Sequence, residues 1–171
     1  MASKLTRHGE PPLYAPTRRL TDASPHQFED QPPYIVKPLY GSKSHNINKV
    51  TTLPSTNTWT EPMIVQPFID GEEYTINIDA TNHEIDCYAI THIGGTDEPW
   101  RHQPTHTDVT DDITAELIER CEEAADQINL VFGRFDVKTP SLDALREGRF
   151  TILEANGPLS LNLTLYTDQS F

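Results

Sequence analysis

Hydrophobic and polar residues alternate most clearly in the stretch Gly133–Asn162 (GRFDVKTPSLDALREGRFTILEANGPLSLN). Successive side chains of a β-strand point to opposite faces of the sheet. The first arm of this stretch therefore places Phe135 and Val137 on an apolar face. Its opposite face receives three charged side chains: Arg134, Asp136 and Lys138. The pattern predicts a β-hairpin with one apolar and one polar face.

The second arm of the hairpin repeats the pattern. Thr151, Leu153 and Ala155 are expected on the apolar face, and Glu154 and Asn156 on the other face together with Ile152. If the loop Thr139–Arg149 folds symmetrically, Asp136 lies opposite Glu154 and Arg134 lies opposite Asn156, about 5 Å away. Two carboxylates and an amide oxygen on one face suit a hard cation such as Mg²⁺. A solvated hairpin face of mixed charge is the alternative.

Other short apolar runs predict further strands. They are Tyr34–Leu39, Met63–Ile69, Tyr74–Ala80 and Glu84–Ile93. The second and third are separated by Asp70-Gly71, which predicts a tight bend between two paired strands. Gly94–Asp108 has no period and is expected to be a long loop. Met1–Pro33 is irregular, with helical turns expected only at Ser3–His8 and Ser24–Asp30.

One segment, Thr110–Leu130, has the period of an amphipathic helix. Its apolar stripe is Ile113, Leu117, Cys121, Ala124 and Ile128. Thr110, Asp111 and Asp112 are expected to cap its first turn. Several antiparallel strands with one main helix packed on them define an α+β fold class.

The composition of the chain argues against two classes of binding partner. The chain has 171 residues, 14 of them proline, and a formal charge of −13, which repels nucleic acid and anionic membranes. Neither a signal peptide nor a membrane-spanning apolar run is seen, so a cytoplasmic location is expected. Cys87 and Cys121 fit no paired spacing and are expected to be buried free thiols. The acidic profile fits a salt-rich cytoplasm, with an ordinary acidic protein as the alternative.

Four segments, in this order, resemble the ATP-grasp enzymes, in particular the carboxylate–amine ligase branch that includes D-alanine–D-alanine ligase. They are YIVKPLYGSKSHNI, MIVQPFIDGEEYT, GRFDV and ILEANG. The resemblance implies an α+β ATP-grasp fold, in which two small lobes hold ATP between them. Residues 1–65 would form a partial first lobe with the phosphate-covering loop. Residues 66–171 would form the second lobe, and the domain that usually precedes the lobes is expected to be absent.

The resemblance also implies a nucleotide site. Lys37 would contact a phosphate, with Lys4 as the second phosphate lysine. A loop would close over the β- and γ-phosphates through Ser42, Lys43 and Ser44. Gln66 and Ile69 would line the adenine, where the hinge backbone reads the base edge. Glu73 would accept hydrogen bonds from the ribose hydroxyls, and Glu72 is the alternative residue for this role.

The hairpin would hold the catalytic centre. The resemblance implies that Asp136, Glu154 and Asn156 bind Mg²⁺, with Mn²⁺ as an alternative ion. Arg134, together with Lys37, would be catalytic by steadying the transferred phosphoryl group. Asn162 would meet the acceptor substrate, and Arg101 would supply a further cation. Lys138 is expected to lie too far from the metal ligands to reach the phosphates.

The implied reaction is ATP-dependent activation of a small-molecule carboxylate as an acyl phosphate, which an amine then attacks. Such catalysis is mostly positioning and charge neutralisation. A non-catalytic ATP-binding module, a fragment or subunit of a split enzyme, and an ATP-dependent small-molecule kinase are the alternatives. A partner subunit or a homodimer is an accompanying expectation.

The acidic surface yields a prediction on salt. If like-charge repulsion destabilises the fold, screening by added salt relieves it. We expect the thermal midpoint to rise between about 0.05 and 2 M KCl, where the Debye length falls from above 10 Å to below 3 Å. A midpoint that stays flat or falls with salt contradicts adaptation to a salt-rich cytoplasm.

Overall fold

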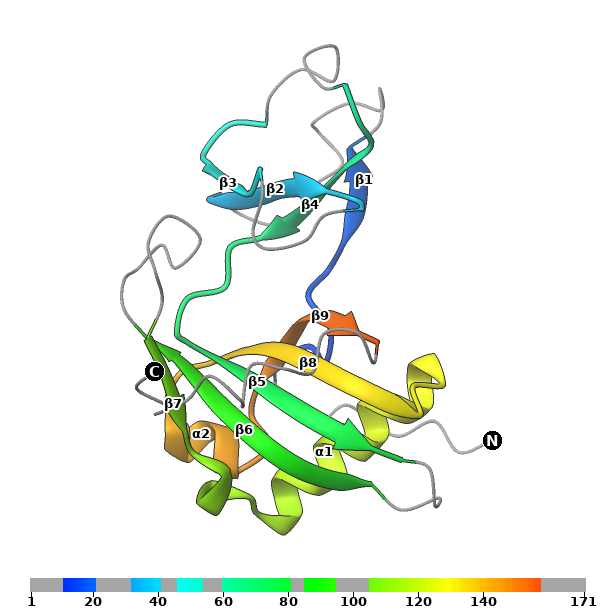
Figure 1. The fold of residues 1–171 in the computed structure, drawn as a ribbon. Helices are drawn as coiled ribbons and strands as arrows, with labels where there is room; N and C mark the ends of the chain where they lie inside the picture. The colour runs from blue at the N-terminus through cyan, green and yellow to red at the C-terminus, as the bar shows by residue number, and fades with distance from the viewer. Residues whose placement is uncertain are drawn as a thin grey trace, which may run out of the picture. The chain divides into compact units, whose positions relative to one another are not determined.

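The computed structural model describes residues 11–20, 32–40, 46–53, 60–80, 85–94 and 105–157. The chain divides into two compact units, drawn in Figure 1. Of the described residues, those between 15 and 69 belong to the smaller unit, and residues 11–14, 70–80, 85–94 and 105–157 belong to the larger one. The division between the units falls after Ile69, four residues later than the boundary suggested by the sequence.

The smaller unit is an antiparallel sheet with the strand order β1-β4-β2-β3. Its strands are β1 (Arg18–Leu20), β2 (Tyr34–Pro38), β3 (Asn48–Val50) and β4 (Met63–Pro67). Alternation in β2 and β4 buries one apolar face, consisting of Tyr34, Val36, Met63 and Val65. The sequence predicted β2 and β4 but missed β1 and β3, which have only three residues each and contain charged side chains.

The larger unit contains a five-stranded antiparallel sheet with the order β7-β6-β5-β8-β9. The strands are β5 (Glu72–Asp79), β6 (Asp86–Gly94), β7 (Thr105–Asp108), β8 (Phe132–Thr139) and β9 (Thr151–Asn156). The predicted hairpin across Asp70-Gly71 is wrong, because β4 and β5 pair in different sheets. The expected long loop is also wrong in part, since its last four residues form β7.

Helices cover one face of this sheet (Figure 1). They are α1 (Ala115–Ile128), preceded by a 3-10 turn at Thr110–Asp112, and the short α2 (Leu142–Arg146), which lies within the loop between β8 and β9. The predicted cap at Thr110–Asp112 is wrong, because α1 begins later. Its N-cap is Thr114, whose hydroxyl accepts a hydrogen bond from the Leu117 amide at 3.2 Å.

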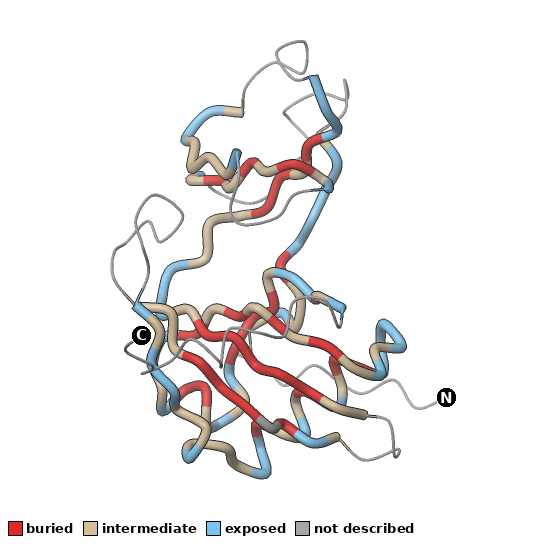
Figure 2. The backbone as a smooth tube through the Cα atoms, in the orientation of Figure 1, coloured by how far each residue is buried: buried red, intermediate tan, exposed pale blue. Residues whose placement is uncertain are grey.

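The predicted apolar stripe is confirmed at its three central positions, but its first residue, Ile113, lies before α1 and is only partly buried against the core. Leu117, Cys121 and Ala124 are fully buried, whereas Ile128 is 42 % exposed, because α1 ends there with Asn129 in a left-handed conformation. The stripe packs on the core face of β5, β6, β8 and β9, and the buried residues of these strands are red in Figure 2. Cys87 is buried beside Cys121, and both thiols are free, as predicted.

The N-terminal end of the described chain is also part of the larger unit. Tyr14 forms a bridge with Ile152, and its hydroxyl donates to the Ala124 carbonyl at 2.8 Å. The Leu13 carbonyl accepts a hydrogen bond from the Ile152 amide. Residues 11–14 therefore lie against both β9 and α1. In the part of the chain that the structure describes, no helix is long and apolar enough to cross a membrane.

The predicted hairpin register is confirmed: Asp136 pairs with Glu154, and Arg134 pairs with Asn156. The pairing shifts between Asp136 and Val137, so that Val137 lies opposite Ile152. This β-bulge leaves Leu153 as the extra residue and reverses the faces of the residues before it. Ile152 is therefore in the core and 1 % exposed, and the prediction that Leu153 takes its place is wrong.

This bulge generates a prediction on stability. Ile152→Ala removes a fully buried side chain, so we expect a loss of about 2–5 kcal/mol in the free energy of unfolding. Leu153→Ala removes a partly exposed side chain and should cost less than about 1.5 kcal/mol. Urea denaturation of the two variants measures both values. A larger loss at Leu153 than at Ile152 would contradict the bulge.

Candidate functional site

The face of the five-stranded sheet opposite α1 is lined by polar side chains, and we call it the polar face. Its members are Glu73, Thr75 and Asn77 on β5, Thr91 on β6, Arg134, Asp136 and Lys138 on β8, and Glu154 and Asn156 on β9. Cross-strand pairing sets these side chains in rows. The central row runs Glu154–Asp136–Thr75–Thr91 from β9 to β6.

Asp136 is at the centre of the polar face and is held by two neighbours. The Arg134 guanidinium lies against both carboxylate oxygens, with Nε 2.9 Å from Oδ1 and Nη2 3.0 Å from Oδ2. The Asn156 amide donates to Oδ2 at 2.8 Å. The sequence had grouped these three residues, and the structure brings them into direct contact. Glu154 stands directly opposite Asp136 on the edge strand.

The environment of Asp136 disfavours its charge. Burial raises the pKa of the Asp136 carboxyl to about 6, although the Arg134 guanidinium opposes this rise. Two other carboxylates of the polar face, Glu154 and Glu73, raise the pKa further. Like charges that face each other across two strands repel. The polar face is therefore an electrostatically costly arrangement that a bound cation would relieve.

Two threonines extend this central row. Thr75 and Thr91 are 2 % and 0 % exposed, and neither hydroxyl has a hydrogen-bond partner within the described residues. Buried polar groups in folded proteins are nearly always paired. Unused hydrogen-bonding capacity therefore lies next to Asp136, on the side of the row away from Glu154. The sequence analysis missed both residues, although the alternation of YTINID places Thr75 on the same face as Glu73.

The structure distinguishes Glu73 from Glu72, the alternative candidate for the ribose contact. Glu72 lies on the core face of β5, where its carboxylate accepts a hydrogen bond from the Tyr74 hydroxyl at 2.6 Å. Burial and this hydrogen bond raise the pKa of Tyr74. Glu73 points to the polar face, where its carboxylate is 3.5 Å from the Lys138 ammonium group. Only Glu73 shares a face with the metal-ligand candidates.

Lys138 does not stand apart from the candidate site. It pairs directly with Glu73 across β5 and β8, and its ammonium group donates to the Gly71 carbonyl at 3.0 Å. The expectation that Lys138 does not reach the phosphates stays a prediction, but its contact with Glu73 means that Lys138 cannot be treated as unconnected to the candidate site. The alternation of β8 places Lys138 on the polar face, and the pairing of β8 with β5 brings it beside Glu73.

In the smaller unit, Lys37 lies on the face of β2 opposite the buried Val36. Its cross-strand partner is Ile64 of β4. A lysine on a rigid strand, directed away from the core, is suited to binding an anion. The role of Lys37 in phosphate binding stays a prediction.

The residues expected to form the adenine-binding hinge, Gln66–Ile69, make contacts within the smaller unit itself. Gln66 is 5 % exposed and donates to the Thr17 hydroxyl at 2.7 Å. The Phe68 amide donates to the Pro33 carbonyl, and the Lys49 ammonium group lies 3.4 Å from the centre of the Phe68 ring. Ile69 is partly exposed after the end of β4. Because the Gln66 side chain is already bonded, adenine contacts here would come from the main chain or from Ile69.

Six residues singled out from the sequence lie outside the described ranges. They are Lys4, Arg101 and Asn162, and the loop residues Ser42, Lys43 and Ser44. Their roles stay predictions. Within the described ranges, no three or more His, Cys, Asp or Glu side chains cluster as a metal site. The candidate ligand set on the polar face instead combines two carboxylates with the Asn156 amide.

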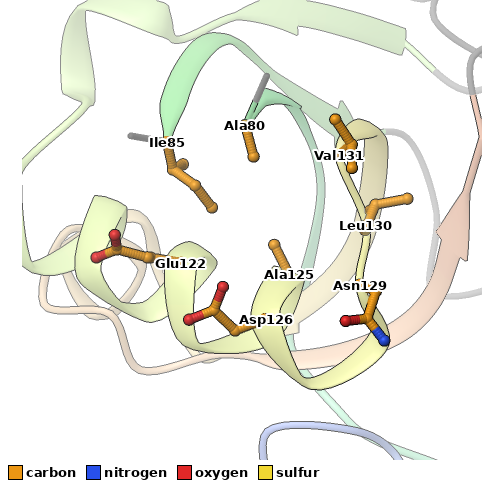
Figure 3. Close-up of a pocket in the computed structure, with 8 residues that line it drawn as sticks. All are labelled: Ala80, Ile85, Glu122, Ala125, Asp126, Asn129, Leu130 and Val131. Atoms are coloured by element: carbon orange, nitrogen blue, oxygen red, sulfur yellow. The ribbon is translucent and has the colours of Figure 1, made fainter. Parts of the chain in front are cut away.

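A hollow of about 290 Å³ lies at the C-terminal end of α1 (Figure 3). Its lining residues are Ala80, Ile85, Glu122, Ala125, Asp126, Asn129, Leu130 and Val131. None of them belongs to the polar face. The hollow is therefore separate from the candidate site.

The larger unit is an antiparallel sheet with helices on one face and a carboxylate–amide cluster on the other, and the smaller unit is a second antiparallel sheet, so the fold class is α+β, as predicted. The sequence profile of the ATP-grasp domain matches residues 2–157, so the chain belongs to the ATP-grasp family. A comparison with curated protein sequences gives no match.

Solved structures agree with this fold. An L-amino acid ligase from Bacillus licheniformis matches with a TM-score of 0.60 and 12% identity, over 86% of this chain and 37% of that one. D-alanine–D-alanine ligase from Bacillus anthracis, complexed with ATP, matches at 0.52 and 19%, over 84% and 49%. The ATP-grasp ligase PsnB, complexed with minimal precursor, Mg and ADP, matches at 0.52 and 15%, over 81% and 42%. The chain thus spans less than half the length of each of these proteins.

The raised pKa of Asp136 generates a prediction on pH. The folded state binds this proton more tightly than the unfolded state, so the wild-type free energy of unfolding falls as pH rises from about 4 to above 6. Asp136→Asn removes the charge. The change also leaves the Arg134 guanidinium without its carboxylate partner, which is destabilising at every pH. We therefore expect the stability of the variant relative to wild type to rise by about 3 kcal/mol between pH 4 and pH 8. Urea titrations at both pH values measure the difference, and a pH-independent difference would contradict the burial of this charge.

Proposed function

We propose that this chain forms the ATP- and Mg²⁺-binding part of an ATP-dependent ligase, which activates a carboxylate as an acyl phosphate for attack by an amine. Family membership and the fold of ATP-grasp ligases support the proposal. The observation that carries it is the contact of Asp136 with Arg134 and Asn156, directly opposite Glu154. These residue types supply oxygen ligands for a cation and a guanidinium for a phosphoryl group.

The donor set fits Mg²⁺. This ion prefers one or two carboxylates, keeps several waters and shares the phosphate oxygens of a nucleotide. Asp136 and Glu154 supply the carboxylates, and the Asn156 amide supplies a neutral oxygen once it turns from its present hydrogen bond. When bound, the ion neutralises charge on the phosphates. Burial is the main cause of the raised pKa of Asp136, and repulsion by Glu154 and Glu73 adds to it; with the ion bound, this repulsion would be replaced by attraction to the ion.

Arg134 is proposed to serve both states of the site. Without metal, its guanidinium neutralises Asp136. With a cation on the carboxylates, the same guanidinium would be released to bind the oxygens of the transferred phosphoryl group, for which its fork-shaped donors are suited. Arg134 shares β8 with Asp136, and Glu154 and Asn156 are on the adjacent β9, so the exchange is proposed to need only a movement of the Arg134 side chain.

The nucleotide is proposed to engage Glu73 through its ribose and Lys37 through a phosphate. Glu73 is partly exposed, with 25% of its side chain accessible, and its ionised carboxylate accepts hydroxyl donors. Small-molecule carboxylate and amine substrates remain the proposed acceptors. We also propose that this ATP-binding portion acts within a larger ligase or together with a partner subunit, because it spans less than half of the ligases it resembles.

The test of this proposal is Glu154→Gln. The change keeps the size of the side chain and removes one ligand charge, so we expect Mg²⁺-dependent ATP binding to weaken by roughly 10- to 100-fold or more. Isothermal titration calorimetry with Mg²⁺–ATP measures this loss, and phosphate release in the presence of amino acids reports turnover.

Glu147→Gln is the matched control. Glu147 is an exposed carboxylate beside Arg149 at the end of α2, and its change should leave Mg²⁺–ATP affinity within about twofold. Equal affinities of wild type and Glu154→Gln for Mg²⁺–ATP would contradict the proposed metal site. ATP binding without any phosphate release would support a non-catalytic ATP-binding module instead.

A further inference from the structure

Lys138 is held in the polar face more firmly than a surface lysine. Only 12% of its side chain is exposed, although lysine is rarely buried without a partner. Its ammonium group is 3.0 Å from the Gly71 carbonyl and 3.5 Å from the Glu73 carboxylate. Two oxygens from one short segment of β5 and the turn before it therefore compensate the lost hydration of the charge.

The turn that supplies the Gly71 carbonyl is fixed against β8. Gly71 has φ +121°, and a Cβ atom at this position would be 2.3 Å from the Thr139 carbonyl oxygen. Only glycine fits there, because both the backbone conformation and the close approach exclude a side chain. Since Thr139 follows Lys138 in β8, the same contact fixes the distance from the Gly71 carbonyl to the start of the Lys138 side chain.

Glu73 receives its orientation from this arrangement. Its side chain is partly exposed and has several rotatable bonds, so an unpaired Glu73 would lose conformational entropy on binding a ligand. The Lys138 ammonium group lies near one carboxylate oxygen, Oε2. An ionised carboxylate has about four lone-pair sites, so most of its acceptor capacity stays available to hydroxyl donors.

We infer that Lys138 is a positioning residue that presents the Glu73 carboxylate to the ribose hydroxyls of the nucleotide, an inference that rests on the proposed function. Lys138 does not touch the ligand in this arrangement. It holds Glu73 in the acceptor orientation before binding, which lowers the ordering cost of recognition. It also offsets the negative charge of Glu73 beside the other carboxylates of the polar face.

The test compares ATP with 2′,3′-dideoxy-ATP, which lacks both ribose hydroxyls. Calorimetry with Mg²⁺ present measures both affinities for wild type, Lys138→Met, Glu73→Gln and the double variant. We expect wild type to prefer ATP by roughly tenfold or more, because hydrogen bonds to a charged group are lost in the analogue. Lys138→Met should reduce this preference to about two- to threefold, and it should have no further effect on the preference in the Glu73→Gln background.

Two more variants separate positioning from general stability. Lys138→Arg keeps a cation that reaches the same oxygens, so it should restore most of the preference for ATP. Arg149→Met removes one exposed positive charge paired with Glu147 and should leave the preference unchanged. Thermal melting of each variant verifies that it is folded.

The outcomes separate this inference from the proposed function. If Lys138→Met weakens ATP and dideoxy-ATP equally, Lys138 acts only through structure or overall charge, and the inference is overturned while ATP binding stands. If wild type binds both nucleotides equally well, Glu73 does not recognise the ribose, and the inference is again overturned. If wild type binds neither nucleotide, the proposed function fails as well.

Discussion

The buried carboxylate of Asp136 constrains the larger unit more than any other group on the polar face. A charge with little access to water needs partners, and Asp136 obtains them from Arg134 on its own strand and Asn156 on the edge strand. A shift of one residue between β8 and β9 would move the amide away and would also turn apolar residues out of the core. The same register therefore satisfies both faces of the sheet.

This double constraint explains why the hairpin could be predicted from the sequence. Phe135 and Asp136 alternate with their neighbours so regularly that the faces of β8 follow directly, and the register was obtained from a symmetrical loop. The bulge at Leu153 could not be predicted from the sequence. Ile152 and Leu153 are both apolar, so either residue could face the core. The strands β1, β3 and β7 are short and polar, so partner strands rather than their own sequences decide their structure.

The sequence identified the site residues whose side-chain type itself suggests chemistry. It did not identify the residues that have a role only because of their neighbours in the fold. Glu72 and Glu73 are equivalent in the sequence, and only the Tyr74 hydroxyl and the Lys138 ammonium group distinguish them. Thr75 and Thr91 are ordinary strand residues until the sheet buries their hydroxyls beside Asp136. Such roles depend on contacts between segments far apart in the chain, which periodicity within one segment does not encode.

The two faces of the sheet also differ in how they affect stability. On the core face, Ile76, Phe135 and Val137 are fully buried against α1 and α2, and each contributes roughly 1.5–3 kcal/mol by burial. On the polar face, desolvation and like charges oppose folding at neutral pH. Each strand contributes side chains to both faces. Burial on the core face therefore also holds the polar side chains in place and can offset their cost. A sheet with one strongly apolar face can therefore keep its carboxylates in an unfavourable arrangement, and under the proposed function a bound cation would stabilise the protein by relieving that repulsion.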